Sequence, residues 1–131
     1  MSELSQLRGV VVAHGLLADG LVDAVRRICG ADADALSAVS NLGLAPDGLA
    51  EAVRAAAGPG PVIVFTDLVG GSCGFVATRL SRDISEIAVV GGVNLPVLLE
   101  FVNNRELSLS ELLPRLLDRG RAAICCASKP R

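Results

Sequence analysis

The sequence contains a single histidine, His14, which directly follows a short run of mostly β-branched residues, Gly9–Ala13. Asp67 follows a second such run, Val62–Thr66, in the same way. Continuous apolar runs of this length are typical of strands that are covered on both faces. In an open parallel sheet, ligands bind beyond the carboxyl ends of the strands, where the strand order reverses. The pattern therefore predicts that His14 and Asp67 share one edge of a sheet, within hydrogen-bonding reach.

An imidazole beside a carboxylate has a definite chemical use. The carboxylate accepts the proton of one ring nitrogen, which fixes the tautomer and leaves the lone pair of the other nitrogen free. That free nitrogen can attack phosphorus and hold a phosphoryl group covalently. We therefore interpret His14 as a candidate phosphoryl acceptor and Asp67 as the residue that orients its imidazole.

The residues that follow Asp67 could receive the negative charge of a phosphoryl group. Gly70 and Gly71 allow backbone N–H groups to approach a phosphate, and the helix expected after them adds a favourable dipole. Ser72 could donate its hydroxyl to a phosphoryl oxygen. A glycine turn with serine as the helix N-cap is also common without any ligand, so this assignment depends on its place beside His14.

Two other chemistries use the same part of the chain. Ser72, His14 and Asp67 could form a hydrolase triad, but no G-x-S-x-G elbow surrounds the serine. Cys73, near the start of the expected helix, could pair with His14 as a thiol catalyst, but the sequence supplies no second redox partner. Both alternatives fit less well than phosphoryl transfer.

The composition excludes further classes of function. The four cysteines (Cys29, Cys73, Cys125 and Cys126) show no C-x-x-C spacing, so we expect no metal site and interpret them as buried small hydrophobes in a reducing cytosol. The net charge of −2 and the absence of Trp and Tyr argue against a nucleic-acid partner. No apolar run is long enough to span a membrane, and residues 1–8 lack the apolar run of a signal peptide. We expect a cytoplasmic protein without a cofactor or membrane insertion.

Strands and helices alternate along the 131 residues, which form one domain by length. Residues 1–8 are expected to be a polar extension and residues 128–131 a polar tail. The alternation predicts an α/β fold, an open, doubly wound, mainly parallel sheet with helices on both faces. Pro114 predicts an irregular first turn or a later start of the last helix. Further strands are expected over Ala35–Ser40, Ile87–Val90 and Ala122–Ala127, and helices over Leu17–Cys29, from Pro46 to Gly58, over Ser72–Ser81, from Asn94 to Asn103 and from Ser108 to Asp118.

Three blocks together resemble the EIIA domain of the mannose-type phosphoenolpyruvate-dependent sugar phosphotransferase system. They follow one another in the family's order and cover nearly the whole chain: Val11–Gly15 with Leu17–Ala24, Phe65–Ser72, and Gly92–Leu98. The resemblance implies that His14 takes a phosphoryl group from phospho-HPr and passes it to an EIIB component. It assigns Asp67 to orienting the imidazole and Ser72 to contacting the phosphoryl group. It also implies a homodimer in which the last strand, Ala122–Ala127, joins the partner's sheet as an antiparallel edge.

Two features depart from that family's pattern. Cys73 stands where proline is usual, which implies a looser phosphate-binding turn. The chain ends at Arg131 without a fused EIIB domain, so EIIB is expected as a separate protein or is absent. Two alternatives to sugar transport stay open: a regulatory protein whose phosphorylation state is sensed by a partner, and a catalytically silent dimeric interaction module.

Overall fold

A computed structural model describes residues 6–128 of the chain. The predicted N-terminal extension and polar tail therefore lie largely outside the described residues. The last two residues of that predicted extension belong to the fold, since Leu7 is 2% exposed in the core and Arg8 begins the first strand.

Four parallel strands form one sheet in the order β2-β1-β3-β4. They are β1 (Arg8–Ala13), β2 (Leu36–Ser40), β3 (Val62–Thr66) and β4 (Ile87–Val90). The chain runs from β1 outward to β2 and then returns to the other side of β1, so the strand order reverses between β1 and β3. The predicted open parallel sheet is confirmed, and its switch point lies where β1 and β3 end.

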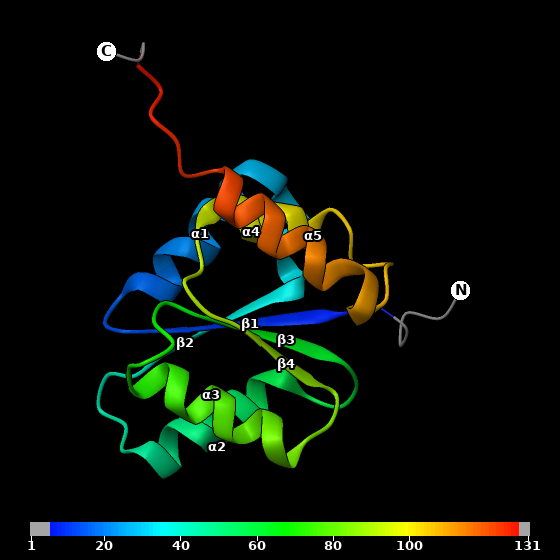
Figure 1. The fold of residues 1–131 in the computed structure, drawn as a ribbon. Helices are drawn as coiled ribbons and strands as arrows, with labels where there is room; N and C mark the ends of the chain where they lie inside the picture. The colour runs from blue at the N-terminus through cyan, green and yellow to red at the C-terminus, as the bar shows by residue number, and fades with distance from the viewer. Residues whose placement is uncertain (1–5, 129–131) are drawn as a thin grey trace.

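Helices cover both faces of this sheet (Figure 1). One face carries α1 (Leu17–Cys29), the short 3-10 helix η2 (Gly30–Ala35), α4 (Leu95–Val102) and α5 (Leu109–Ala122), and the other carries α2 (Pro46–Ala57) and α3 (Ser72–Asp83). Alternate residues of a strand point to opposite faces, so both faces of β1 and β3 must be apolar. None of the helices in residues 6–128 is both long and apolar enough to cross a membrane.

Aromatic side chains pack closely where α4 covers the sheet. Phe65 on β3 and Phe101 on α4 pack edge to face, with ring centroids 5.3 Å apart. Gly9 permits this approach, because a Cβ there would lie 2.9 Å from the Phe101 ring and 2.7 Å from Cδ2 of Leu36. A glycine at the start of β1 is therefore a packing requirement.

The last helix begins where its capping residues predicted. Ser108 and Glu111 form a complete capping box, and α5 starts at Leu109. Pro114 lies inside the helix, after the first turn, and the helix continues through it to Ala122 instead of ending at Asp118. The predicted irregular start at this proline is thus replaced by a capped first turn.

The predicted fifth strand, Ala122–Ala127, is absent from the described chain. Ala122 is the last residue of α5, and residues 124–127 have no regular secondary structure. Figure 1 shows this segment leaving the body of the molecule. A strand needs a neighbouring strand to pair with, and the single chain offers none to these residues, so the apolar run alone does not form one.

Candidate functional site

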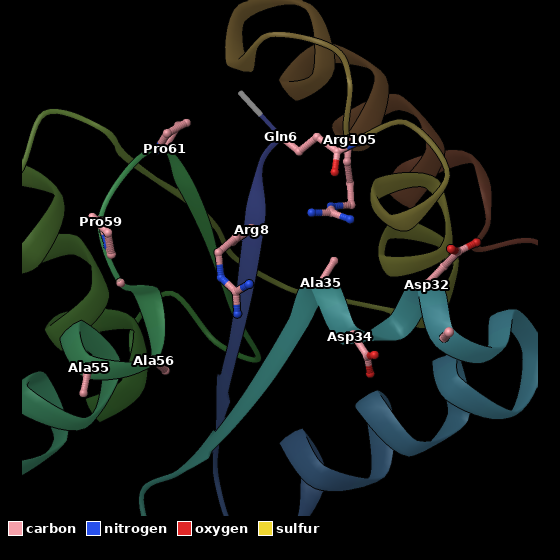
Figure 2. Close-up of a pocket in the computed structure, with 12 residues that line it drawn as sticks. Gln6, Arg8, Asp32, Asp34, Ala35, Ala55, Ala56, Pro59, Pro61 and Arg105 are labelled. Carbon is pink, nitrogen blue, oxygen red and sulfur yellow. The ribbon is translucent and has the colours of Figure 1, made fainter. Parts of the chain in front are cut away.

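A cavity of about 660 Å³ lies at the edge of the sheet where the strands begin. Figure 2 shows Arg8, Asp34 and Arg105 among its lining residues. The Arg105 Nε donates a hydrogen bond to the Leu7 carbonyl at 2.7 Å, and Asp34 pairs with Arg26 at 2.7 Å. None of the residues predicted to do chemistry lines this cavity, and they lie instead at the opposite edge.

His14 occupies the first position after β1, in the turn that leads to α1. Gly15 adopts φ +60°, a conformation that favours glycine, and so turns the chain sharply. Two residues at the end of β2 hold this turn: Asn41 Oδ1 accepts from the Gly15 N–H at 3.0 Å, and the Ser40 hydroxyl donates to the Gly15 carbonyl at 2.7 Å. The imidazole is thereby presented at the rim, with its side chain 43% exposed.

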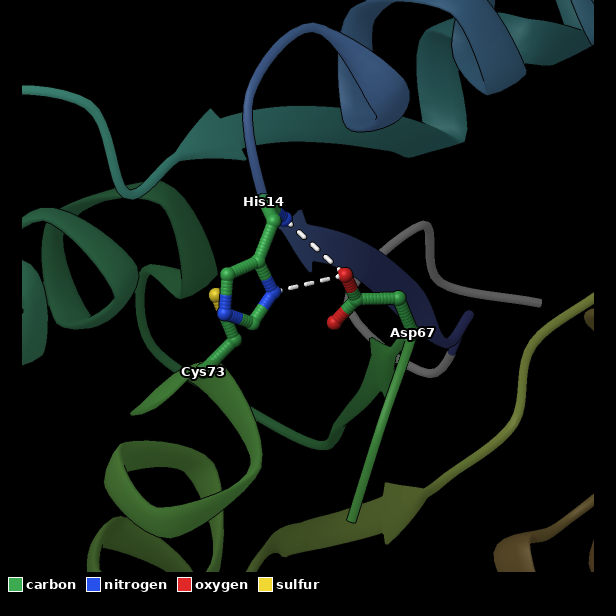
Figure 3. A group of neighbouring side chains, drawn as sticks. All are labelled: His14, Asp67 and Cys73. Atoms are coloured by element: carbon green, nitrogen blue, oxygen red, sulfur yellow. Dashed lines mark hydrogen bonds and ion pairs between the residues drawn. The ribbon is translucent and has the colours of Figure 1, made fainter. Parts of the chain in front are cut away.

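Asp67 occupies the first position after β3, and its side chain is only 12% exposed. Its Oδ2 accepts a hydrogen bond from the His14 backbone N–H at 3.0 Å and lies 2.8 Å from the ring Nδ1 (Figure 3). Its Oδ1 accepts from the Leu68 N–H at 2.9 Å. The structure thus brings together the two residues that the strand pattern placed on one edge.

The electrostatics of this pair define the tautomer. Burial raises the pKa of Asp67, but hydrogen bonds from the His14 backbone and ring and from the Leu68 backbone, with the charge of His14, lower it more, so the pKa lies below its ordinary value. An ionised carboxylate can only accept hydrogen bonds. Nδ1 therefore carries the proton in this pair, and in the neutral ring Nε2 keeps its lone pair.

The start of α3 faces the other side of the imidazole. A Cβ on Gly71 would lie 2.9 Å from Cε1 and 3.5 Å from Nε2 of His14, so the glycine backbone packs directly against the ring. Ser72, the first residue of α3, has its hydroxyl oxygen 3.5 Å from Nε2. Gly70 stands one residue further away in open space. The first N–H groups of a helix have no partners within it, so α3 offers donors near Nε2.

Cys73 lies next in α3 and is fully buried, as predicted. The same prediction is wrong for the other cysteines, since Cys29 is half-buried and Cys125 and Cys126 are exposed after the last helix. Burial, and then the charge of Asp67, raises the pKa of its thiol, with a smaller opposite effect from the Ser72 hydroxyl. A neutral thiol is a poor nucleophile, which argues against the thiol-catalyst alternative. Gly74 allows α3 to pack against the preceding loop, because a Cβ there would overlap the carbonyl oxygens of Leu68 and Val69.

Two features of the site are not among those predicted from the sequence. Ser40 and Asn41 support the His14 turn, and the signal available was a pair of polar residues directly after a predicted strand. The second feature is a rim of large apolar side chains, exposed by between 59% and 74%, on the loops after β1, β2 and β3 and on the first turn of α3. The rim consists of Leu16, Leu42, Leu68, Val69 and Phe75.

Solved structures of phosphotransferase-system proteins share this architecture. EIIA from Streptococcus agalactiae superimposes with a TM-score of 0.85 at 24% identity, covering 92% of this chain and 96% of that one. The mannose/sorbose-specific IIA subunit from Enterococcus faecalis gives 0.83 at 25% identity, covering 96% and 98%. A sigma-54 interaction domain protein from Enterococcus faecalis shares the fold at 13% identity, with a TM-score of 0.73 and coverage of 89% and 92%.

A match of the sequence to a family model shows the family to which the chain belongs. The family model for the PTS system fructose IIA component matches residues 9–116, and the chain belongs to this family. No curated protein matches the chain. Membership supports a phosphoryl-carrier role in a sugar phosphotransferase system, as a transferase component of that system.

Proposed function

We propose that the chain carries a phosphoryl group on Nε2 of His14, which it receives from phospho-HPr and passes to an EIIB component. The observation that supports this most directly is the contact of 2.8 Å between Asp67 Oδ2 and His14 Nδ1. Since the proton is held on Nδ1, the nucleophilic lone pair is on Nε2, which faces Ser72.

The transfer step places a specific demand on Asp67. The Nε2 lone pair attacks phosphorus, the bond between phosphorus and the donor breaks, and its electron pair returns to the donor. The ring then has substituents on both nitrogens and carries a positive charge. The Asp67 carboxylate already contacts Nδ1, so it stabilises this charge without rearranging. Onward transfer to EIIB reverses the same step.

The start of α3 is proposed to hold the phosphoryl oxygens. The backbone N–H groups of Gly70 and Gly71 donate no hydrogen bond among the described residues, and the Ser72 hydroxyl stands beside Nε2. The partial positive charge at a helix N-terminus adds to these donors. Because the backbone donors remain, Ser72→Ala should slow transfer less than His14→Ala, which removes the acceptor.

The surface around His14 is suited to protein donors and acceptors. The imidazole is 43% exposed at a rim of apolar side chains that includes Leu16, Val69 and Phe75. Exposed apolar groups that gather in one place mark interaction sites. A protein that presents its own phosphorylated group within an apolar surface would bury this rim as the two reacting atoms meet.

The test is phosphoryl transfer in a mixture of phosphoenolpyruvate, EI, HPr and the protein, read by intact mass at neutral to alkaline pH. We expect one acid-labile addition that is absent in His14→Ala, with folding of the variant checked by circular dichroism. Adding EIIB should remove the group. Stable phosphorylation without transfer to EIIB would favour the regulatory alternative, and no addition with active partners would favour the silent interaction module.

We also propose that residues 1–131 form one EIIA domain that assembles as a homodimer. Ile124, in the segment after α5, is 81% exposed, which is unusual for isoleucine. Pairing of residues 124–127, which follow α5, with a partner's sheet would cover it. Light scattering should give twice the chain mass for the full chain, and one chain mass after removal of residues 123–131.

A further inference from the structure

Three side chains of different chemistry converge at the rim of the sheet. A ring nitrogen of His14, a carboxylate oxygen of Asp67 and the Cys73 sulfur all lie within 4.8 Å of one another. We propose that these residues bind a thiophilic divalent cation of the Zn²⁺ type, and that this cation and a phosphoryl group exclude each other at His14. The first part stands on geometry alone, and the second rests on the proposed function.

The set of donors is the one that zinc prefers. Imidazole nitrogen, thiolate sulfur and carboxylate oxygen bind Zn²⁺ at about 2.0–2.3 Å in a tetrahedral arrangement, with water in any position the protein leaves open. Ligand atoms around such an ion lie roughly 3.5 Å apart, which follows from those bond lengths. The three ligand atoms lie up to 4.8 Å from one another, so side-chain movements of about an ångström would bring them to the separations that a bound ion requires.

The three residues come from separate elements that fix their backbones. His14 follows β1, Asp67 follows β3 and Cys73 lies in the first turn of α3. Their exposure is graded: Cys73 is fully buried, and the side chains of Asp67 and His14 are 12% and 43% exposed. The site therefore has its thiol on the buried side and its imidazole on the exposed side. Figure 3 shows the imidazole between the Asp67 carboxylate and the Cys73 sulfur. An ion can enter past the ring and be held in surroundings that exclude most water.

Binding is a simple exchange of a proton for a metal. The cation forms bonds to the Cys73 sulfur and to a ring nitrogen of His14, loses coordinated water, and releases the thiol proton to solvent. No oxidant or reductant takes part. Asp67 either ligates the ion directly or keeps its hydrogen bond to Nδ1, which is the usual way that a carboxylate orients a metal-binding histidine.

Either binding mode removes the nucleophile. If the ion binds Nε2, it occupies the lone pair that would attack phosphorus. If it binds Nδ1, the ring proton moves to Nε2, and that nitrogen again has no lone pair to offer. Conversely, a phosphoryl group on Nε2 takes up the lone pair of that nitrogen and fills the space beside Ser72 and the start of α3, where the ion would sit. Metal and phosphoryl group are therefore alternative occupants.

The direct test uses Co²⁺ as a spectroscopic probe, because a thiolate ligand gives it a charge-transfer band in the near ultraviolet. The exposed pair Cys125 and Cys126 would bind the probe by itself, so both are replaced by serine in the full chain. Cys73→Ala is then compared with Cys29→Ala, a matched change at a partly buried cysteine outside the cluster. Reductant is present in a form without thiols, and circular dichroism confirms folding.

We expect a stoichiometric band in the Cys29→Ala protein and affinity at least about tenfold weaker, without the band, after Cys73→Ala. His14→Ala should weaken the band in the same way. An equal band in Cys73→Ala and Cys29→Ala, or no band in either at saturating Co²⁺, would overturn the site.

Mutual exclusion is tested with purified phospho-HPr and Zn²⁺. Zinc at its binding concentration should slow phosphorylation of the Cys29→Ala protein at least about tenfold, and phosphorylated protein should show no Co²⁺ band. Phosphorylation at full rate with the metal bound would overturn the exclusion. A Co²⁺ band without any phosphorylation would contradict the proposed function and leave the metal site intact, so the two failures are distinguishable.

Discussion

Replacing Asp67 by asparagine tests how the site is activated, because the contacts of the two carboxylate oxygens are unequal. Oδ2 meets two N–H donors, from the backbone and ring of His14, and Oδ1 meets one, from Leu68. An amide has one acceptor oxygen and one donor nitrogen. No orientation of the introduced amide can therefore accept from all three groups.

Each orientation has its own cost. With the amide oxygen toward His14, the Leu68 N–H faces a donor and the negative charge beside the ring is gone. With the amide nitrogen toward His14, the ring is favoured in the tautomer that protonates Nε2, which cannot attack phosphorus. A hydrogen bond to a charged group contributes about 1.5–3 kcal/mol. At about 1.4 kcal/mol per factor of ten, the rate of phosphorylation should fall roughly tenfold to a hundredfold.

The assay is the rate of phosphoryl addition from phospho-HPr, followed by intact mass over time. Asp83→Asn provides the matched control, since it makes the same chemical change at an exposed position at the end of α3. Circular dichroism should show the same fold in both variants. Equal rates in the Asp67→Asn variant and the parent protein would refute the proposed role of the carboxylate.

Three further predictions concern the contacts around the site and the thiols. Gly71→Ala should slow phosphorylation strongly and Gly70→Ala only weakly, because a Cβ at position 71 would press on the imidazole at 2.9 Å whereas one at position 70 meets nothing within 4 Å. At neutral pH, iodoacetamide should modify Cys126 well before Cys73, because hydrogen bonds from Ser128 lower the pKa of the Cys126 thiol whereas burial raises the pKa of the Cys73 thiol. Peptide mass spectrometry gives the order of labelling, and faster labelling of Cys73 would contradict the prediction. The pKa of Asp67 is lower in the folded than in the unfolded protein, so its contribution to stability is present above its ordinary pKa and is lost as pH falls through the folded value. When urea unfolding is measured against pH, the free energy of unfolding should therefore fall less on acidification in Asp67→Asn than in the parent protein.

Much of the fold could be predicted because the strands are buried on both faces. The runs Val62–Thr66 and Ile87–Val90 match β3 and β4 residue for residue, and Leu17–Cys29 matches α1. In each case the local sequence pattern favours the same secondary structure as the packing around the segment. The juxtaposition of His14 and Asp67 followed from the same argument, since it needs only strand ends and the reversal of strand order.

The remaining features depend on contacts that no local pattern specifies. Residues 124–127 are apolar enough for a strand, but a strand exists only where another strand accepts its hydrogen bonds. The packing of Gly71 against the imidazole depends on how closely α3 approaches β1, which is set by side chains between helix and sheet. Asn41 supports the His14 turn across 26 residues, a separation that spacing rules do not cover.

The precision of the His14–Asp67 contact comes from the core beneath it. In the parallel ladder Val12 lies opposite Thr66. Asp67 is the next residue after Thr66 and His14 is the second residue after Val12, so this register sets where the two functional side chains meet. A slip of one residue between β1 and β3 would move His14 along the strand by about 3.3 Å, more than the whole 2.8 Å contact. It would also turn Phe65 away from Phe101 and toward α3, so the register is held by burial on both faces. The geometry that activates the histidine is therefore maintained by apolar packing, and core substitutions that loosen β3 should reduce phosphoryl transfer before they unfold the protein.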